Sequence, residues 1–214
     1  METQTSKKHW ENVFATKQPT EVSWFQTYPQ TSIDFIELFK LPLTANIIDI
    51  GGGDSCLVDV LLEKGYQNVT VLDISANALK RAKKRLGKKA KQVNWIVSDI
   101  TDFKPQIKYD FWHDRAAFHF LTTNEAIYKY VAIAENTINK NGYLILGTFS
   151  ENGPKKCSGL EITQYNETSM NARFEVSFKK IKCITENHIT PFNTTQNFLF
   201  CSFQKTANCN EVDC

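Results

Sequence analysis

The sequence lacks the marks of several protein classes. None of its six cysteines forms a C-x-x-C pair and no histidine stands at zinc-finger spacing, so no metal site is expected. No window approaches the roughly 20 apolar residues of a membrane helix, which argues against membrane insertion. The start METQTSKKHW has no apolar core of signal-peptide length. Because the cysteines are scattered along the chain, we predict that they are reduced and that the protein is cytoplasmic.

A strong excess of one charge is also missing. The net charge of +2 gives the protein as a whole no electrostatic reason to bind nucleic acid or anionic lipid. A basic run at 80–91 is typical of a solvated helix face, and the alternative is a docking surface for an acidic partner. We expect a monomer or a weak homodimer.

What the sequence does contain is a regular alternation of apolar runs and helical patterns. Strands are predicted at 46–50, 69–72, 93–97, 109–113 and 143–149. Helices are predicted at 5–17, 33–39, 57–62, 78–86 and 126–138, with Ser55 and Ser75 as N-caps and Asn141-Gly142 closing the last helix. The segment 165–174 stays unassigned.

Strands that alternate with helices predict a parallel sheet with helices on both faces. Two longer strand patterns, 178–190 and 196–205, predict an antiparallel hairpin at the sheet edge. The predicted fold class is therefore α/β, with a Rossmann-like, mostly parallel sheet of seven strands. We predict one domain over 1–205, whose residues 1–42 form a helical lid, and a mobile tail over 206–214.

Three groups of residues with binding chemistry follow successive strands. Asp49-x-Gly51-x-Gly53 comes directly after the first strand, where glycine lets the backbone approach a ligand closely. Asp73 ends the second strand and suits a ribose, while Asp99 follows the third strand and suits an adenine amino group. The alternative is a tight turn with acids that only cap helices. Since open α/β sheets bind ligands at the carboxyl ends of their strands, we favour a nucleoside site.

These residues carry a family resemblance. The run IIDIGGGD…LDIS…KKRL, together with VSDI, DFWHDRAAFHFL and NKNGYLILGTF, resembles class I S-adenosylmethionine-dependent methyltransferases over 47–149. The resemblance implies S-adenosylmethionine as the cofactor. Ser55 and Asn141 depart from the usual Gly and Pro without removing a required charge. By position, the implied cofactor residues are Asp49, Gly51 and Gly53 for the methionine part, Asp73 and Ile74 for the ribose and adenine, Asp99 and Ile100 for the purine edge, and Asp114 beside the sulfonium.

The acceptor side is harder to predict. The opening HWENVFATKQPTEVSWF resembles the entry segment of thiol, halide or thiopurine methyltransferases and of small protein-lysine methyltransferases, which implies a lid over the cofactor. The Asn/Asp-Pro-Pro-aromatic tetrapeptide of base-modifying enzymes is missing, which weighs against nucleic acid as acceptor. Each candidate below has an alternative as a packed core or lid residue. The catalytic candidates are His113, Asp114 and His119, and the acceptor-binding candidates are Trp24, Phe25, Tyr28 and Phe118, with Trp10 in the same aromatic wall and Cys157 at its border.

We therefore predict an S-adenosylmethionine-dependent methyltransferase whose acceptor is a small molecule, a thiol or another soft nucleophile. The alternatives are a protein-lysine methyltransferase, an NAD-dependent oxidoreductase of Rossmann type and a non-catalytic relative. The chain has no Tyr-x-x-x-Lys pair of the short-chain dehydrogenase type, which weighs against the oxidoreductase.

Overall fold

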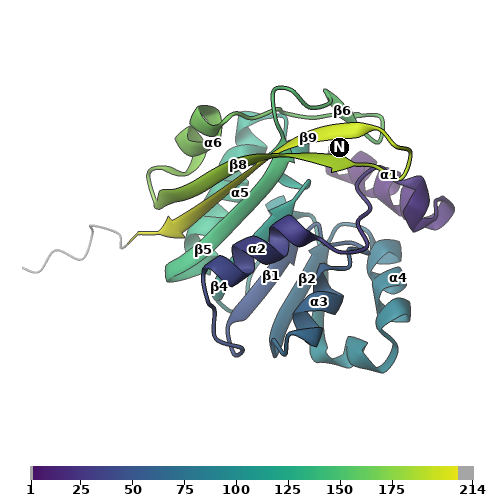
Figure 1. Cartoon of the computed structure of the whole chain (residues 1–214), viewed down its shortest axis with the longest axis horizontal. Helices are drawn as coiled ribbons and strands as arrows, with labels where there is room; N and C mark the ends of the chain where they lie inside the picture. The colour runs from purple at the N-terminus through teal and green to yellow at the C-terminus, as the bar shows by residue number, and fades with distance from the viewer. Residues whose placement is uncertain (1, 207–214) are drawn as a thin grey trace, which may run out of the picture.

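A computed structural model describes residues 2–206, with side chains from residue 5 onward. The predicted tail lies outside the described residues except for Thr206. Seven strands form one sheet in the order β3-β2-β1-β4-β5-β9-β8 (Figure 1). Strands β1 to β5 run parallel to one another, and β9 runs antiparallel to both of its neighbours, β5 and β8. This confirms the predicted fold class. The strands are β1 Asn46–Ile50, β2 Asn68–Asp73, β3 Val93–Val97, β4 Tyr109–Arg115, β5 Ile138–Phe149, β8 Phe178–Ile189 and β9 Thr195–Lys205.

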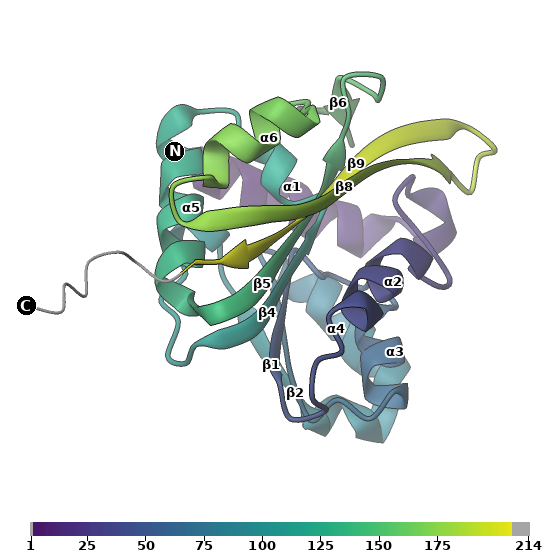
Figure 2. The ribbon, with the colours of Figure 1, turned by 60° about the vertical axis from the view of Figure 1, so that its left-hand side comes forward.

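Helices cover both faces of the sheet because apolar side chains leave each buried strand alternately on its two sides. Ile47 of β1 packs in a cluster with buried residues of α2, α3 and α4, whereas Ile48 packs in a cluster with buried residues of α5 and α6. The helices of the two clusters lie on opposite faces of the sheet (Figure 2). The helices are α1 Glu2–Thr16, α2 Gln30–Leu38, α3 Leu57–Glu63, α4 Ala76–Leu86, α5 Asn124–Thr137 and α6 Glu167–Phe174. Short 3-10 turns are η1 Pro19–Glu21, η2 Gly87–Gln92, η3 Ile100–Asp102 and η4 Phe118–Phe120, and a small hairpin joins β6 Lys156–Cys157 to β7 Leu160–Glu161.

Local signals placed most helix ends. Ser75 is the N-cap of α4, and its hydroxyl accepts a hydrogen bond from the Ala78 amide, as predicted. The prediction for Ser55 was wrong by one residue, because Cys56 occupies the N-cap position of α3 while the Ser55 hydroxyl accepts from the Leu57 amide. The unassigned segment contains α6, whose start is fixed by a capping box between Asn166 and Ser169.

Two predictions about the second half need correction. Residues 138–142 belong to β5, because Ile138 is fully buried opposite Tyr109 of β4, so α5 ends before Asn141-Gly142. The prediction that all cysteines are reduced was also wrong, because Cys183 and Cys201 form a disulfide between β8 and β9. Their Cα atoms are 4.2 Å apart in directly opposed positions of the antiparallel pair, a pairing that sequence spacing does not reveal. Among residues 2–206, no helix has the length and apolar character to cross a bilayer.

Candidate functional site

A cavity of about 530 Å³ lies at the carboxyl ends of β1 to β4. Gly51 after β1, Asp73 and Ile74 at the end of β2, and Asp99 and Ile100 after β3 all contribute to its wall. The structure thus brings together five of the predicted cofactor residues. Helix α1 closes the cavity from above with Thr5, Ser6, Trp10 and Phe14.

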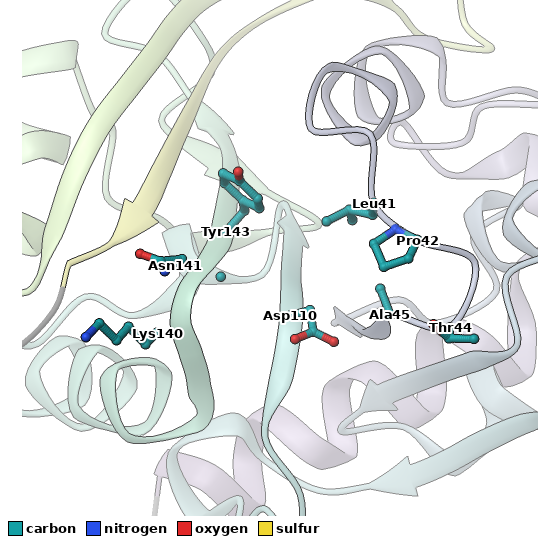
Figure 3. Close-up of a pocket in the computed structure, with 9 residues that line it drawn as sticks. Leu41, Pro42, Thr44, Ala45, Asp110, Lys140, Asn141 and Tyr143 are labelled. Carbon is teal, nitrogen blue, oxygen red and sulfur yellow. The ribbon is translucent and has the colours of Figure 1, made fainter.

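A smaller hollow of about 240 Å³ lies at the opposite, amino-terminal edge of the sheet (Figure 3). Asp110 is the one acid in its lining, and both of its carboxylate oxygens already accept hydrogen bonds, from the Asn46 amide at 2.9 Å and the Asn139 side chain at 2.7 Å. Lys140 extends away from Asp110 (Figure 3). Over the described residues, no three His, Cys, Asp or Glu side chains gather as metal ligands would. We therefore place the functional site in the larger cavity.

The glycine loop brings backbone to the cavity floor. Gly51 has a φ of +63°, and a Cβ built there would lie 2.6 Å from the Cβ of Ala117, so only glycine fits. Gly53 does not line the cavity but lies behind it, where an added Cβ would be 3.2 Å from the Asp73 carboxylate. The two glycines thus let the β1–α3 loop pass close to both the ligand space and Asp73.

The two acids after β2 and β3 differ in their surroundings. Asp73 is 5% exposed, and its Oδ1 accepts a hydrogen bond from the Ser75 amide at 2.7 Å. Burial, aided by the nearby charges of Asp49 and Asp54, raises the pKa of Asp73 to about 7. Asp99 is half-buried, and its Oδ1 accepts from the amide and the hydroxyl of Thr101 at 2.8 and 2.7 Å. Each acid is held by the turn that follows its own strand and keeps accessible surface in the cavity.

Asp49 and His113 lie below the cavity and do not line it. His113 Nδ1 is 2.7 Å from Asp49 Oδ1, and its Nε2 is 2.8 Å from the Ser32 hydroxyl. All three side chains are buried. These hydrogen bonds connect α2 to β1 and β4, and they leave no ring nitrogen of His113 free to contact a methyl acceptor.

Asp114 is fully buried on the opposite face of β4. Its carboxylate accepts hydrogen bonds from the amides of Ala117 and Phe118 at 2.9 and 3.1 Å and from the Tyr130 hydroxyl at 2.8 Å. Burial raises the pKa of Asp114 to about 6. The structure therefore places Asp114 outside the cavity, where it shapes the turn that carries Ala117 into the cavity wall.

His119 is likewise enclosed. Its Nδ1 accepts a hydrogen bond from the Phe149 amide at 3.3 Å, and Nε2 has no partner within residues 2–206. Burial, with a smaller effect of Arg115, lowers the pKa of His119 to about 3, so the ring stays neutral at physiological pH. It does not contribute to the lining of the cavity.

An aromatic wall lies over the cavity, but only part of the predicted set belongs to it. Trp10 and Trp24 line the cavity with ring centroids 5.6 Å apart, and Phe120 lies 5.1 Å from Trp10. Phe25 and Tyr28 are not in the lining. Phe118 is fully buried against Tyr130, because the 3-10 turn η4 sends Phe118 into the core and Phe120 to the cavity.

Several lining residues escaped the sequence reasoning. Phe14 stands one helical turn from Trp10, a spacing that was available as a signal. Arg115 is the last residue of β4 and Ala116 follows it, where strand alternation gives way to an irregular turn, so no sequence pattern pointed to them. The remaining lining residues that were not predicted are Thr5, Ser6, Ile50, Leu72, Ser98, Ala117, Phe120, Leu121, Thr122, Leu160 and Glu161.

Glu11 fastens α1 over the site. Its carboxylate accepts hydrogen bonds from the amides of Ala76 and Asn77 and from the Ser75 hydroxyl, at 2.8 to 3.0 Å, at the amino end of α4. Burial alone would raise the pKa of Glu11, but these hydrogen bonds outweigh it and lower the pKa. The positive end of the α4 dipole favours the same charge.

We expect Glu11→Gln to loosen α1 by about 1 kcal/mol, a modest value because the carboxylate is only partly buried. Hydrogen exchange of the α1 amides should then be faster by about fivefold, while exchange in α5 stays unchanged. Glu21→Gln, in the loop after α1, is the matched control. Equal protection of α1 in Glu11→Gln and wild type would contradict the assignment of this contact as the fastening.

We expect Gly51→Val to abolish binding of S-adenosylhomocysteine, because the branched side chain fills the cavity floor and forces the backbone away from a positive φ. Isothermal calorimetry measures the loss, and thermal unfolding checks that the variant folds. Gly159→Val is the control, since that glycine also has a positive φ but an added Cβ meets nothing within 4 Å. Wild-type affinity in a folded Gly51→Val variant would remove the glycine loop from the cofactor site.

Comparison with known proteins agrees with this geometry. The model of a methyltransferase domain family matches residues 44–197. The chain therefore belongs to the methyltransferase domain family. Its fold is shared with solved structures described as S-adenosylmethionine-dependent methyltransferases, so the predicted cofactor is that of the fold family.

Two curated relatives differ in what their names say they act on. Malonyl-[acyl-carrier protein] O-methyltransferase 2 of Ilyobacter polytropus is 29% identical over 107 residues, which are 50% of this chain and 40% of the relative. EEF1A lysine methyltransferase 2 of Mus musculus is 25% identical over 162 residues, 66% of this chain and 64% of the relative. The chain thus spans less than two thirds of the length of either relative.

Solved structures resemble the whole chain. A protein from work on the conversion of a disulfide bond into a thioacetal group during echinomycin biosynthesis superposes with a TM-score of 0.78 at 15% identity, covering 97% of this chain and 96% of that one. The N-methyltransferase NodS of Bradyrhizobium japonicum in complex with S-adenosylhomocysteine gives a TM-score of 0.66 at 17% identity, covering 96% and 99%. At these identities the likeness concerns the fold.

Proposed function

We propose that this protein transfers a methyl group from S-adenosylmethionine to a small-molecule acceptor, a thiol or another soft nucleophile. The observation that carries the proposal is that one cavity is lined both by the two acids that suit a nucleoside and by an aromatic wall. Pockets of about 300–1,000 Å³ suit small molecules. The cofactor, when bound, supplies a methyl carbon that its sulfonium has made electrophilic.

The residues of the chain suit this cofactor in charge and in space. Asp73 would accept hydrogen bonds from ribose hydroxyls and Asp99 one from the adenine amine, and the apolar side chains of Ile74 and Ile100 would lie against the ring. Gly51 leaves room at the cavity floor for the methionine part. We also infer that α1 and the loop after it form a lid, because Trp10, Phe14 and Trp24 cover the same cavity.

The protein contributes to the transfer mainly by position and by exclusion of water. Trp10, Trp24 and Phe120 hold the acceptor against the methyl carbon and keep the space dry. The acceptor would enter as a thiolate that has already lost its proton to solvent, and the cofactor, when bound, would supply the methyl group to its sulfur. His119 lies behind the wall and is neutral, so a thiolate formed in solution before binding needs no base from the protein.

A methyl-transfer assay with labelled cofactor tests this proposal. The protein is incubated with a cell lysate, which is then separated into protein and small-molecule fractions. We expect label in the small-molecule fraction, and we expect Asp73→Asn to reduce it strongly when the cofactor is not saturating. Label confined to the protein fraction would instead favour a lysine acceptor.

A protein-lysine acceptor is the second candidate because of the similarity to EEF1A lysine methyltransferase 2. Mass spectrometry of the labelled proteins distinguishes it, since methyl-lysine would appear on a defined peptide. Absence of label from both fractions, with tight binding of S-adenosylhomocysteine, would favour a non-catalytic relative.

A further inference from the structure

Arg115 brings a positive charge into the half of the cavity that the cofactor residues leave free. The strand order β3-β2-β1-β4-β5 places Asp73 and Asp99 on one side of Gly51 and Arg115, at the end of β4, on the other. Cys157 and Leu160, from the β6–β7 hairpin that follows β5, line the same half. A charged group here therefore faces the space where an acceptor would lie.

The guanidinium of Arg115 is held in place without a close counter-ion. Its Nη1 donates a hydrogen bond to the Trp24 carbonyl oxygen at 3.0 Å, and its central carbon lies 4.9 Å from the centroid of the Phe198 ring. Within the described residues, no carboxylate oxygen is within 4.0 Å of it. Burial lowers the pKa of Arg115 to about 10, and the group stays charged at neutral pH.

The acids and the thiol around Arg115 do not neutralise it at short range. Asp49 and Glu186 both attract Arg115 electrostatically, but neither carboxylate lies within 4.0 Å of it, since Asp49 contacts His113 and Glu186 accepts a hydrogen bond from the Thr31 hydroxyl. Glu161 lines the cavity but lies 2.6 Å from Lys156 Nζ. Burial raises the pKa of Cys157 to about 12, so its thiol is neutral. The guanidinium is therefore a buried positive charge beside the cavity, and a bound anion would offset the free-energy cost of burying it.

We propose that Arg115 binds the anionic group of the acceptor, so that the substrate class is a small apolar molecule that carries a carboxylate or phosphate. This rests on the proposed function. The apolar part lies against Trp10, Trp24 and Phe120, and the anion accepts hydrogen bonds from the guanidinium donors that Trp24 does not use. Planar, two-pronged donation by arginine matches carboxylate and phosphate geometry, whereas a neutral thiol would leave the charge unpaired.

The test uses two pairs of probes that differ in charge but little in shape. They are 3-mercaptopropionate with 3-mercaptopropionamide, and 2-mercaptobenzoate with 2-mercaptobenzamide. Each probe is titrated into the protein saturated with S-adenosylhomocysteine, and binding is followed by calorimetry and by the fluorescence of the tryptophans. We expect the acid of at least one pair to bind about 10- to 100-fold more tightly than its amide.

Variants assign this preference to Arg115. Arg115→Gln should remove the preference, Arg115→Lys should keep part of it, and Arg173→Gln on α6 should leave it unchanged. No preference for the acid of either pair in wild type, or an undiminished preference in Arg115→Gln, would overturn the proposal. Thermal unfolding shows whether Arg115→Gln folds. If Arg115→Gln does not fold, the partial preference expected of Arg115→Lys tests the assignment instead.

The methionine carboxylate of the cofactor is the competing anion. A fall of tenfold or more in affinity for S-adenosylhomocysteine in Arg115→Gln, measured without any probe, would assign Arg115 to the cofactor and overturn the proposal.

Failure of the proposed function can be distinguished from failure of this inference. If the acids bind in an Arg115-dependent way but neither is methylated, only the proposal of a thiol acceptor is disproved. If the protein does not bind the cofactor, the proposed methyltransferase activity is disproved, and the anion site is then tested by the same titrations on the protein without cofactor.

Discussion

Asp73→Asn should lower the affinity for S-adenosylhomocysteine by about 10- to 100-fold at pH 8. Asp73 lines the cavity, and although its carboxylate accepts hydrogen bonds from the amides of Ser75 and Gly53, a carboxylate has further acceptor positions for ribose hydroxyls. A hydrogen bond to a charged group contributes about 1.5–3 kcal/mol. An asparagine keeps the contact with Ser75 through its carbonyl oxygen but presents a donor to one ribose hydroxyl. Calorimetry measures the loss, with Asp102→Asn on η3 as the control.

The pH dependence of binding should identify the same group. Because burial raises the pKa of Asp73 to about 7, protonation removes the stronger acceptor below that pH. We expect affinity in wild type to fall by about tenfold between pH 8 and pH 6, and Asp73→Asn to lose this dependence. A flat profile in wild type between these values would contradict ribose binding by the ionised form.

Asp73 also links binding to stability. Its pKa is higher in the folded than in the unfolded chain, so the folded state favours the protonated form. The stability that this preference contributes is complete below pH 4 and is lost as the pH rises through about 7. Asp73→Asn should therefore raise the melting temperature of the ligand-free protein at pH 8 but not at pH 4. An Asp73→Asn variant that melts at a higher temperature but binds S-adenosylhomocysteine more weakly would show that the ionised acid of the site lowers the stability of the folded protein.

Asp114→Ala should destabilise the protein by about 3 kcal/mol or more. The substitution leaves the amides of Ala117 and Phe118 and the hydroxyl of Tyr130 without their acceptor in a fully buried place. Each unsatisfied buried donor costs about 1–3 kcal/mol. Urea unfolding measures the change, and Asp34→Ala on the exposed side of α2 is the control.

Tyr130→Phe separates the two layers of this network. It removes the hydroxyl that donates to Asp114 and accepts from Trp112 Nε1, so we expect a loss of about 1–2 kcal/mol with the turn amides still satisfied. The outcome that would contradict a supporting role is an Asp114→Ala protein of wild-type stability that has lost methyl transfer. In that case the sequence-based assignment of Asp114 to the reaction would stand.

The sequence predicted the elements and the binding residues wherever one local rule decided them. Short apolar runs bounded by turn residues predicted strands, and β1 and β3 have the predicted bounds. Because parallel strands share one carboxyl edge, Gly51, Asp73 and Asp99 were placed together without knowledge of packing. The hairpin of β8 and β9 followed from two adjacent alternating segments.

Residues beyond the end of β4 could not be assigned in the same way. His113 and Asp114 leave the strand on opposite faces, and the following turn rotates Phe118 into the core and Phe120 to the cavity. The direction of each side chain depends on turn geometry that apolar periodicity does not encode. The disulfide depends on strand register, which was equally out of reach, since Cys183 meets Cys201 only when the hairpin pairs as observed.

The position of β9 has a consequence for synthesis. This strand lies between β5 and β8, although it follows both in the chain, so β8 has no neighbour in the sheet until β9 has formed. As the chain emerges from its amino end, β1 to β5 gain their parallel neighbours in turn. Until β9 has been synthesised, the backbone of β8 has no strand partner, and during that interval β8 is exposed to pairing with another nascent chain. Lys179, Lys180 and Lys182 place charges along it that discourage such pairing.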